Sequence, residues 1–384
     1  MGLNQQCNTL TLLFPMNLVQ AHLISYNVPL NINGNWNFGF LLGIALVIQI
    51  LTGIILASVY IAEIPSAFYS ISYIIEEIHN GYLFRYLHSN GVCLFFMLMY
   101  FHIAKGMFYS CNYLPMSWYT GIVLLIASFA IGFLGYVLPY GQMSYWGATV
   151  IINLFYWIEP LVHLLLGGYS VSGTTLGRFY LLHFVLPFVL LVIIVVHIYY
   201  LHLNSSSNPL SNADSYYTTR FSPTLISSDV YLLIGFFCIC FIQLSYAPVK
   251  LFTGDSDNCI LADPLNTPLH IVPEWYLLPF YGTLKLLPTK IAGMVAMLLF
   301  LQTLTLLVET RRNAYMLSIT NIHRIYSSKR TLMIPLIFII SFIGMFHINS
   351  FTLLIGSFAL CIYNILSISS TQSNSLRIYI STSK

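Results

Sequence analysis

The chain has 384 residues, of which 58% are hydrophobic, 16% aromatic and only 7% charged, and its formal net charge is +3. Soluble proteins carry about 25% charged residues, so this chain cannot cover a water-facing surface and is expected to be an integral membrane protein. No basic cluster is large enough to indicate nucleic-acid binding. The seven cysteines form no C-x-x-C motif, which argues against covalent haem, iron–sulfur clusters and zinc cages.

Eight apolar segments follow one another along the chain, most of them close to the roughly 20 residues that a membrane-spanning helix needs. They are 38–59, 82–108, 118–138, 180–202, 229–247, 291–309, 332–347 and 350–368. We therefore predict an all-α integral membrane protein with eight transmembrane helices and amphipathic helices in its loops. The first four helices, in residues 1–205, form one bundle, and the other four fall in residues 206–384. Two long connections, 139–179 and 248–290, are expected to carry function, as long ordered loops beside a membrane usually do.

Charged residues are distributed unevenly if all eight helices span the membrane. We name the side that bears the N-terminus side n and the opposite side p. Side n then carries nine of the 14 lysines and arginines but only three acids (Asp214, Asp229 and Glu309). Because cations in short loops favour the inner side, both termini are expected there. The nine cations are Lys105, Arg220, Arg311, Arg312, Arg324, Lys329, Arg330, Arg377 and Lys384.

Two of the predicted helices carry two histidines each at the same spacing, His88 and His102 in the second and His183 and His197 in the fourth. Fourteen residues turn a helix by about 1400°, roughly 40° short of four full turns, so both histidines of a helix share one face, about 21 Å apart. The two helices cross the membrane in the same direction. His88 therefore pairs with His183 near side p, and His102 with His197 near side n. Two trans imidazoles suit six-coordinate haem iron and electron transfer.

Each of these residues also has an ordinary structural explanation. A single histidine in a membrane helix is commonly just hydrogen-bonded within the bundle, but two equally spaced pairs on parallel helices are hard to explain that way. Arg85 and Lys105 lie one turn from histidines, where they would meet haem propionates or extend to the membrane interface. Four glycines on the first and third helices repeat the interval of fourteen, which suits either the edge of a macrocycle or close helix packing. They are Gly39, Gly53, Gly121 and Gly135.

Nearly the whole chain resembles the mitochondrial cytochrome b family, the membrane core of the quinol–cytochrome c oxidoreductase (complex III). The motifs are WNFGFLLGIALVIQILTG (36–53), GYLFRYLHSNG (81–91), GFLGYVLPYGQMSYWGATV (132–150), SNPL (207–210) and PEWYLLPFYGTLK (273–285). The resemblance implies two non-covalent b-type haems, a low-potential one on His88 and His183 and a high-potential one on His102 and His197. The single chain and its histidine intervals are similar to the respiratory type rather than to the chloroplast b6 type. The segment AHLISYNVPLNIN resembles alveolate mitochondrial versions.

The resemblance also implies a quinol-oxidation site near side p. Quinol oxidation sheds two protons, and Glu274, a carboxylate at the membrane boundary, would accept one of them. Taken alone, the PEWY motif indicates only a turn at an aromatic belt. Gly282 stands where the family commonly has alanine, and it is expected to loosen one wall of this site. The other implied lining residues are Phe133, Tyr136, Met143, Trp146, Gly147, Ile271, Pro273 and Tyr281.

A second quinone site is implied near side n. His202 ends the fourth predicted helix and Asp229 opens the fifth, and together they can hydrogen-bond and protonate a reduced quinone. Asp229 after two serines also suits a plain helix N-cap. By resemblance His202, Ser206 and Asp229 belong to a quinone-reduction site. Ser228 replaces a lysine that often precedes this aspartate in the family, so proton uptake through such a lysine is not expected.

The function implied by the resemblance is the Q cycle. Ubiquinol is oxidised near side p, electrons cross the membrane through two haems, and quinone is reduced near side n, with proton translocation. The implied partners are a Rieske iron–sulfur protein, cytochrome c1, other complex III subunits and a second copy of the chain. The implied location is the mitochondrial inner membrane, with both termini on the matrix side.

Two other functions stay open at this stage. A different di-haem membrane reductase would lack PEWY and the long loops on side p. A transporter with a histidine proton relay would carry carboxylates at the membrane midplane and broken helices, and the predicted helix interiors here contain almost no carboxylates.

Overall fold

The computed structural model describes residues 20–109, 114–204, 206–209, 217–245, 255–307 and 322–382, together with Asn17, although the side chains of Leu23, Asn204, 322–330 and 369–382 are excepted. The predicted helix ends at 247 and 309 lie outside the described residues. Several of the charges behind the predicted orientation lie outside them too, including Arg311, Arg312 and Lys384.

Helices make up almost all of the described chain, which confirms the predicted fold class. In chain order the elements are η1 (Gln20–Ile24), β1 (Asn27–Pro29), η2 (Gly34–Asn37), α2 (Phe38–Ala57), α3 (Ser66–Glu76), α4 (Gly81–Phe108), α5 (Pro115–Val137), α6 (Gln142–Asn153), α7 (Glu159–Leu166), α8 (Gly173–Asn204), β2 (Thr218–Arg220), α9 (Phe221–Ser245), η4 (Ser256–Cys259), η5 (Trp275–Leu277), α11 (Leu278–Lys285), α12 (Lys290–Leu306), α14 (Ile322–Met345) and α15 (Ser350–Thr382).

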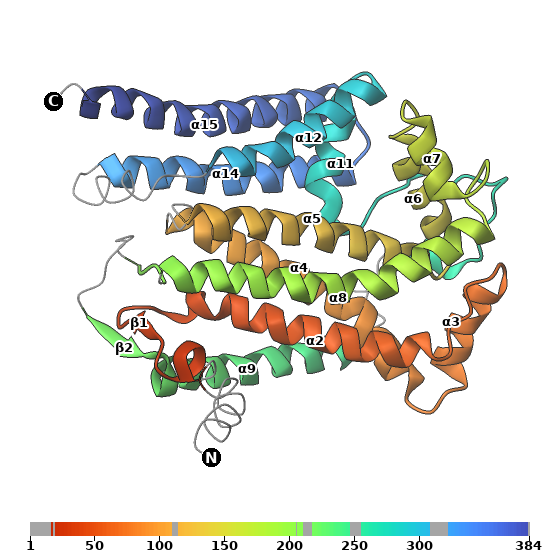
Figure 1. The fold of residues 1–384 in the computed structure, drawn as a ribbon. Helices are drawn as coiled ribbons and strands as arrows, with labels where there is room; N and C mark the ends of the chain where they lie inside the picture. Colours follow the sequence, from red (N-terminus) through yellow and green to blue (C-terminus); the bar gives the residue numbers. More distant parts are fainter. Residues whose placement is uncertain are drawn as a thin grey trace, which may run out of the picture.

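The long helices lie side by side and define two ends of the molecule (Figure 1). Strands β1 and β2 mark one end, side n, and α3, α6 and α7 mark the other, side p. Helices α2 and α4 pack against each other, as do α5 and α8, while α11, α14 and α15 form a second layer that meets α4 through α14. Both α4 and α8 begin at side p (Figure 1), so these two histidine-bearing helices run in the same direction, as predicted.

Six of the described helices are long and apolar enough to span a membrane. They are Gly34–Ala57, Gly81–Phe108, Pro115–Val137, Gly173–Leu203, Phe221–Ser245 and Ser350–Ile368. The other two predicted spans correspond to the shorter apolar helices Lys290–Leu306 and Thr331–Met345. The chain is therefore a multi-pass membrane protein with helices at all eight predicted positions, six of them of full spanning length.

Three helices begin before the apolar spans predicted in them. Helix α8 begins at Gly173, ahead of the span at 180, α9 at Phe221, ahead of the span at 229, and α14 at Ile322, ahead of the span at 332. Hydropathy identifies only the part of a helix that lies in lipid, and each of these helices continues beyond it as a polar segment. At the start of α8 the side chain of Thr175 is fully buried and donates a hydrogen bond to the Leu166 carbonyl at 2.7 Å, which fixes the added turn.

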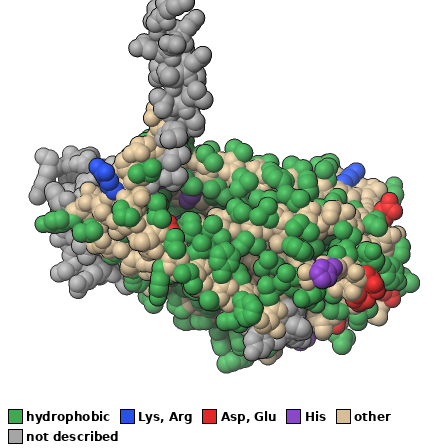
Figure 2. Space-filling view, turned by 90° about the horizontal axis from the view of Figure 1, so that it is seen from below, with side chains coloured by type: hydrophobic (Ala, Val, Ile, Leu, Met, Phe, Trp, Pro, Cys, Tyr) green, Lys and Arg blue, Asp and Glu red, His purple; other side chains and the backbone are tan. Residues whose placement is uncertain are grey.

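The outer faces of the bundle are apolar. Val192 and Val195 of α8 and Phe241 of α9 are 66%, 67% and 70% exposed, as expected for side chains that face lipid tails. Figure 2 shows hydrophobic side chains over most of one face, with the acidic side chains in view gathered mainly at one end. Inside, Leu94, Phe96 and other residues of α4 form the centre of the largest buried cluster of the described residues, to which α2, α5, α8, α9 and η5 also contribute.

A short antiparallel pair of strands was not predicted. Strand β1 pairs with β2 in the register Asn27 to Arg220, Val28 to Thr219 and Pro29 to Thr218. Backbone bonds extend the pair at both ends, from Leu30 N to the Tyr217 carbonyl and from Phe221 N to the Tyr26 carbonyl. The segment before the first spanning helix is thereby held against the segment before α9.

Candidate functional site

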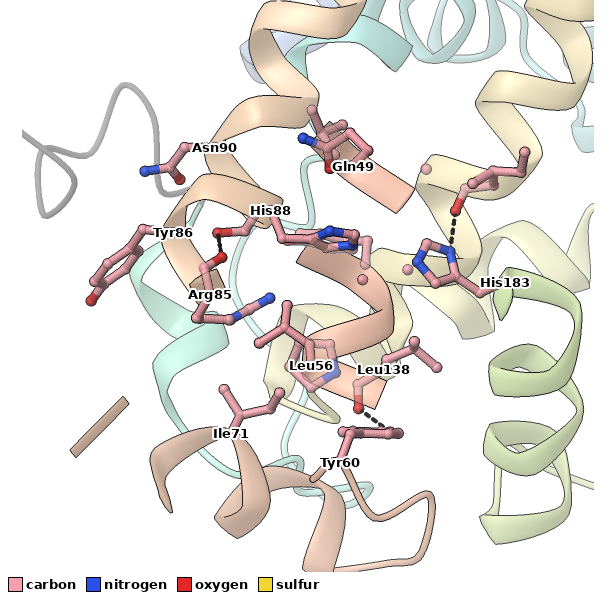
Figure 3. Close-up of a pocket in the computed structure, with 18 of the residues that line it drawn as sticks. Gln49, Leu56, Tyr60, Ile71, Arg85, Tyr86, His88, Asn90, Leu138 and His183 are labelled. Atoms are coloured by element: carbon pink, nitrogen blue, oxygen red, sulfur yellow. Dashed lines mark hydrogen bonds between the residues drawn. The ribbon is translucent and has the colours of Figure 1, made fainter. Parts of the chain in front are cut away.

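The histidine pairs predicted from spacing face each other in the structure. The ring centres of His88 and His183 lie 6.1 Å apart, and those of His102 and His197 lie 6.4 Å apart. Figure 3 shows the rings of His88 and His183 directed toward each other from α4 and α8. A metal–imidazole bond is about 2 Å long, so two trans imidazoles on one metal have ring centres about 6 Å apart. Both separations fit a metal ion held between the rings.

The number of ligands indicates which group fits. Within the described residues, no cluster of three or more His, Cys, Asp or Glu side chains is positioned to hold a metal. A closed zinc site needs four protein ligands and a catalytic one three, whereas haem iron takes only its two axial ligands from the protein. Each facing pair therefore fits haem rather than a bare metal ion.

On side p, two glycines leave room for the imidazoles. A Cβ on Gly53 would lie 3.0 Å from His88 Cε1, and a Cβ on Gly135 would overlap His183 Cε1. The contact at Gly135 is closer than real Cβ atoms approach, and the contact at Gly53 is tighter than nine in ten real Cβ contacts. An alanine at Gly135 would therefore displace the His183 ring.

The glycines near side n repeat this arrangement. A Cβ on Gly39 would lie 3.4 Å from His102 Cε1, and one on Gly121 would lie 3.3 Å from His197 Cε1. All four glycines thus lie against the imidazole rings themselves. The glycines are fourteen residues apart because each lies opposite one histidine, and the histidines of the neighbouring helix are themselves fourteen residues apart.

Hydrogen bonds orient three of the four imidazoles. Thr52 Oγ1 lies 2.9 Å from His88 Nδ1, Thr120 Oγ1 lies 3.0 Å from His197 Nδ1, and the Ile131 carbonyl lies 2.9 Å from His183 Nδ1. Such contacts hold a metal-binding histidine by one nitrogen and leave the other for the metal. Sequence reasoning missed both threonines, although each directly precedes one of the four glycines.

The two predicted propionate partners differ in their surroundings. Arg85 lines the cavity beside His88 (Figure 3). Lys105 instead places its ammonium group 4.1 Å from the centre of the Trp36 ring, a cation–π contact. Of the two, Arg85 is the cation directed into the side-p site.

A cavity of about 640 Å³ surrounds the side-p histidines. This volume lies within the range of small-molecule and cofactor sites, about 300–1,000 Å³. The cavity reaches from His88 and His183 to Tyr136, Glu274 and Tyr276, so the side-p histidine pair and part of the predicted quinol site share one space. The other predicted quinol-site residues do not line it: Phe133, Met143, Trp146, Gly147, Ile271, Pro273 and Tyr281.

Glu274 has the properties of a proton acceptor at the edge of this cavity. Burial, and secondarily the negative charge of Asp255, raises the pKa of Glu274 to about 7. A general base is most effective when its pKa lies near the working pH. The predicted turn alone would not require a buried carboxylate there.

The PEWY segment is anchored to α4 by a tyrosine that sequence reasoning did not single out. The ring of Tyr276 stacks on Phe96 with centres 3.9 Å apart, and the Tyr276 carbonyl accepts a hydrogen bond from the Tyr100 hydroxyl at 2.5 Å. Tyr281 donates to the Ile271 carbonyl at 3.0 Å. These contacts hold the chain on both sides of Glu274.

The expectation for Gly282 was wrong. A Cβ at Gly282 would overlap the Ile340 carbonyl of α14, so the glycine faces the second helix layer instead of the quinol pocket. Its effect is to let α11 pack directly on α14.

Several of the remaining predicted residues support the same corner of side p. A Cβ on Gly147 would reach 4.0 Å from Tyr136, and the Tyr136 carbonyl accepts a bond from Ser144. Phe133 packs edge-on against Phe179 with ring centres 5.9 Å apart. Met143 is buried, and the Trp146 ring nitrogen is buried without a partner in the described residues.

The residues predicted for side n divide into two groups. Asp229 is only 6% exposed and accepts a hydrogen bond from Asn37 at 2.5 Å. The regular part of α9 follows the non-helical Ser222, so Asp229 lies inside the helix and the N-cap explanation was wrong. The other group surrounds His202, whose Nδ1 lies 3.1 Å from His22 Nδ1 and whose ring stacks on Tyr26.

Ser206 lies half-buried just after α8. Sequence reasoning missed His22, Tyr26 and Asn37. The motif WNFGF contains Asn37, but its contact with a residue 192 positions away could not be inferred from either segment alone.

Comparisons with known proteins agree with this geometry. The family model described as cytochrome b/b6/petB matches residues 23–205, and the one described as cytochrome b (C-terminal)/b6/petD matches residues 261–364. A hyperthermophilic respiratory complex III contains a chain of similar structure, with a TM-score of 0.85 and 25% sequence identity over 94% of this chain and 96% of that chain.

Curated relatives extend the similarity over most of their own length. Cytochrome b of Theileria parva is 46% identical over 341 residues, 89% of this chain and 94% of that protein. Cytochrome b of Plasmodium falciparum is 49% identical over 298 residues, 78% of each chain, and that of Toxoplasma gondii is 44% identical over 302 residues. The resemblance to alveolate sequences is thereby confirmed. The chain belongs to the cytochrome b family.

Proposed function

We propose that this chain is the electron-carrying, di-haem subunit of a respiratory complex III. The observation that carries the proposal is the pair of facing imidazole sets, at 6.1 and 6.4 Å, each ring lying against a glycine. His88 and His183 would hold one b-type haem, and His102 and His197 the other. When bound, the two haems supply one-electron carriage between the two sides of the membrane.

On side p the chain supports oxidation of ubiquinol. Glu274 accepts a proton from the quinol, and its raised pKa lets it release that proton again near neutral pH. Tyr136 lines the same cavity, and the Tyr281 hydroxyl holds the Ile271 carbonyl and thereby the start of the PEWY segment. Arg85 places a positive charge at the edge of the cavity, where it can pair with an anionic group such as a haem propionate.

On side n the chain supports reduction of quinone. His202 and Asp229 supply hydrogen bonds and protons to the two quinone oxygens, with Ser206 as a further polar contact. Asn37 positions Asp229 through the bond to its carboxylate. Uptake of protons on side n and release on side p makes the reaction electrogenic, which is the Q cycle.

The proposal includes the setting of the chain. Residues 1–205 form the haem-binding part, and residues 206–384 add the PEWY segment and the second helix layer. The partners are a Rieske iron–sulfur protein, cytochrome c1, further complex III subunits and a second copy of the chain. The location is the mitochondrial inner membrane, with both termini on the matrix side.

A redox titration of the purified complex, followed by its reduced-minus-oxidised absorbance spectrum, tests the proposal. We expect a b-type band that titrates with two midpoint potentials and belongs to this subunit. A subunit without any haem absorbance would overturn the proposal and would favour a histidine-relay transporter.

A further inference from the structure

The Nδ1 atoms of the four imidazoles have unequal contacts at the two sites. On side p both are engaged: His88 Nδ1 lies 2.9 Å from Thr52 Oγ1, and His183 Nδ1 lies 2.9 Å from the Ile131 carbonyl. On side n only His197 is engaged, with Thr120 Oγ1 at 3.0 Å. His102 Nδ1 is buried and has no hydrogen-bond partner in the described part of the chain.

The other hydrogen bonds of Thr52 identify the donor in its contact with His88. Thr52 already donates its hydroxyl proton to backbone carbonyls, at 2.7 Å from Ile48 and 3.1 Å from Gln49. Its oxygen can therefore only accept from His88. This assignment places the imidazole proton on Nδ1 and leaves the Nε2 lone pair for a metal.

Thr120 repeats this arrangement at the side-n site. Its hydroxyl lies 2.8 Å from the Met116 carbonyl and 3.0 Å from the Ser117 carbonyl, so it too accepts from the imidazole, here His197. For His183 the acceptor is the carbonyl oxygen of Ile131, which cannot donate. Three of the four ligands are thus held as Nδ1–H donors.

A hydrogen-bond acceptor at Nδ1 affects the reduction potential of the bound metal as well as the orientation of the ring. It raises the basicity of the imidazole, and a more basic ligand stabilises the more oxidised metal. A pair of histidines with two acceptors therefore lowers the reduction potential of its iron more than a pair with one.

We propose that these unequal Nδ1 contacts help to set the side-p haem at a lower midpoint potential than the side-n haem, with Thr52 and Thr120 as positioning residues. This inference rests on the proposed function, because it requires that the two histidine pairs hold haem. It assigns part of the driving force for electron transfer from side p to side n to hydrogen bonds of the protein itself.

Removal of one acceptor at a time tests the inference. In the intact complex, Thr120→Val is expected to raise the midpoint potential of the side-n component and to leave the other unchanged. Thr52→Val is expected to raise only the side-p component. Valine matches threonine in shape, and the matched variants Thr120→Ser and Thr52→Ser keep the hydroxyl and are expected to keep the original potentials.

An added acceptor gives a test of opposite sign. Gly39 approaches His102 much as Gly121 approaches His197, because a Cβ on each would lie 3.9 and 3.7 Å from the respective Nδ1. Phe38 therefore occupies the position that corresponds to Thr120. We expect Phe38→Thr to supply the missing acceptor and to lower the side-n potential.

The outcomes separate this inference from the proposed function. If the unsubstituted complex contains no haem, the proposed function is overturned. If haem is bound but its potentials are unchanged in Thr120→Val, Thr52→Val and Phe38→Thr, only the inference is overturned. Loss of the side-n haem from Thr120→Val but not from Thr120→Ser supports a role of the hydroxyl in holding His197. Loss from both contradicts it.

Discussion

Asn37 and Asp229, 192 positions apart in the chain, are joined by a hydrogen bond of 2.5 Å from Asn37 Nδ2 to Asp229 Oδ1. Asn37 also accepts a bond from Ser228 Oγ at 3.1 Å. Both polar side chains of the pair are almost completely buried, at 1% and 6% exposure. The residue directly before α2 is thereby fixed to α9 at the proposed quinone-reduction site.

We expect Asn37→Leu to destabilise the complex, because it leaves a buried carboxylate without its donor. A hydrogen bond to a charged group contributes about 1.5–3 kcal/mol. The thermal unfolding midpoint and the rate of quinone reduction on side n should both fall. Ser228→Ala is the matched control, since it removes only a neutral hydroxyl bond to the same asparagine. Equal effects of the two variants would show that Asn37 does not hold the carboxylate.

Quinol oxidation should depend on pH through Glu274. The pKa of this carboxyl is raised from 4.5 to about 7, first by burial and then by Asp255, so the ionised, proton-accepting form grows as pH rises through about 7. We expect the rate to rise over that range in the unsubstituted complex and to lose this rise in Glu274→Gln. A rise of the same midpoint in the glutamine variant would assign the titration to another group.

The same carboxyl links stability to pH. Its folded-state pKa lies above the unfolded value, so between about pH 4.5 and 7 the folded protein binds more protons than the unfolded protein. Stability therefore falls as pH rises through that window. Glu274→Gln should weaken this fall, as measured by the thermal unfolding midpoint at several pH values.

His102→Leu should remove one haem and spare the other. Leucine cannot bind iron, so the side-n pair is left with His197 alone, while His88 and His183 lie about 21 Å away along the helix axis. A redox titration should show loss of the higher-potential component with the lower one retained. If both components persisted unchanged, the assignment of His102 as a ligand would be wrong.

Gly135→Ala should displace the His183 ring, because the added Cβ overlaps its Cε1 atom. We expect loss or a large shift of the side-p haem signal in the absorbance spectrum. Gly177→Ala is a suitable control, because a Cβ at Gly177, on the helix that carries His183, meets nothing within 4 Å. A normal spectrum in Gly135→Ala would mean that the glycine is not required by the ligand.

The histidine pairs could be predicted because helix geometry fixes both the angle and the rise between residues on one helix. Contacts between helices follow different rules. Thr52 meets His88 only because α2 packs on α4, and Thr120 meets His197 because α5 packs on α8. The periodicity of a single segment contains no information on that pairing. The two threonines therefore became visible only in the folded structure.

The full extent of the helices and the role of Gly282 could not be predicted, for a related reason. Hydropathy responds to the lipid-facing part of a segment, so it missed the polar first turns of α8, where Thr175 finds its partner in the Leu166 carbonyl. Gly282 follows a predicted site residue in sequence, but its missing side chain faces Ile340 on another helix. Adjacency in the chain does not fix the direction in which a helical residue points.

The pairing of β1 with β2 has a consequence for how the polypeptide tolerates interruption. Strand β1 lies before the first spanning helix, whereas β2 lies in the connection between α8 and α9, and the two backbones pair directly. If the parts of the chain before and after this connection were made as two separate polypeptides, one would carry β1 and the other β2. Their complementary edges would give the pieces a defined way to find each other at the membrane surface.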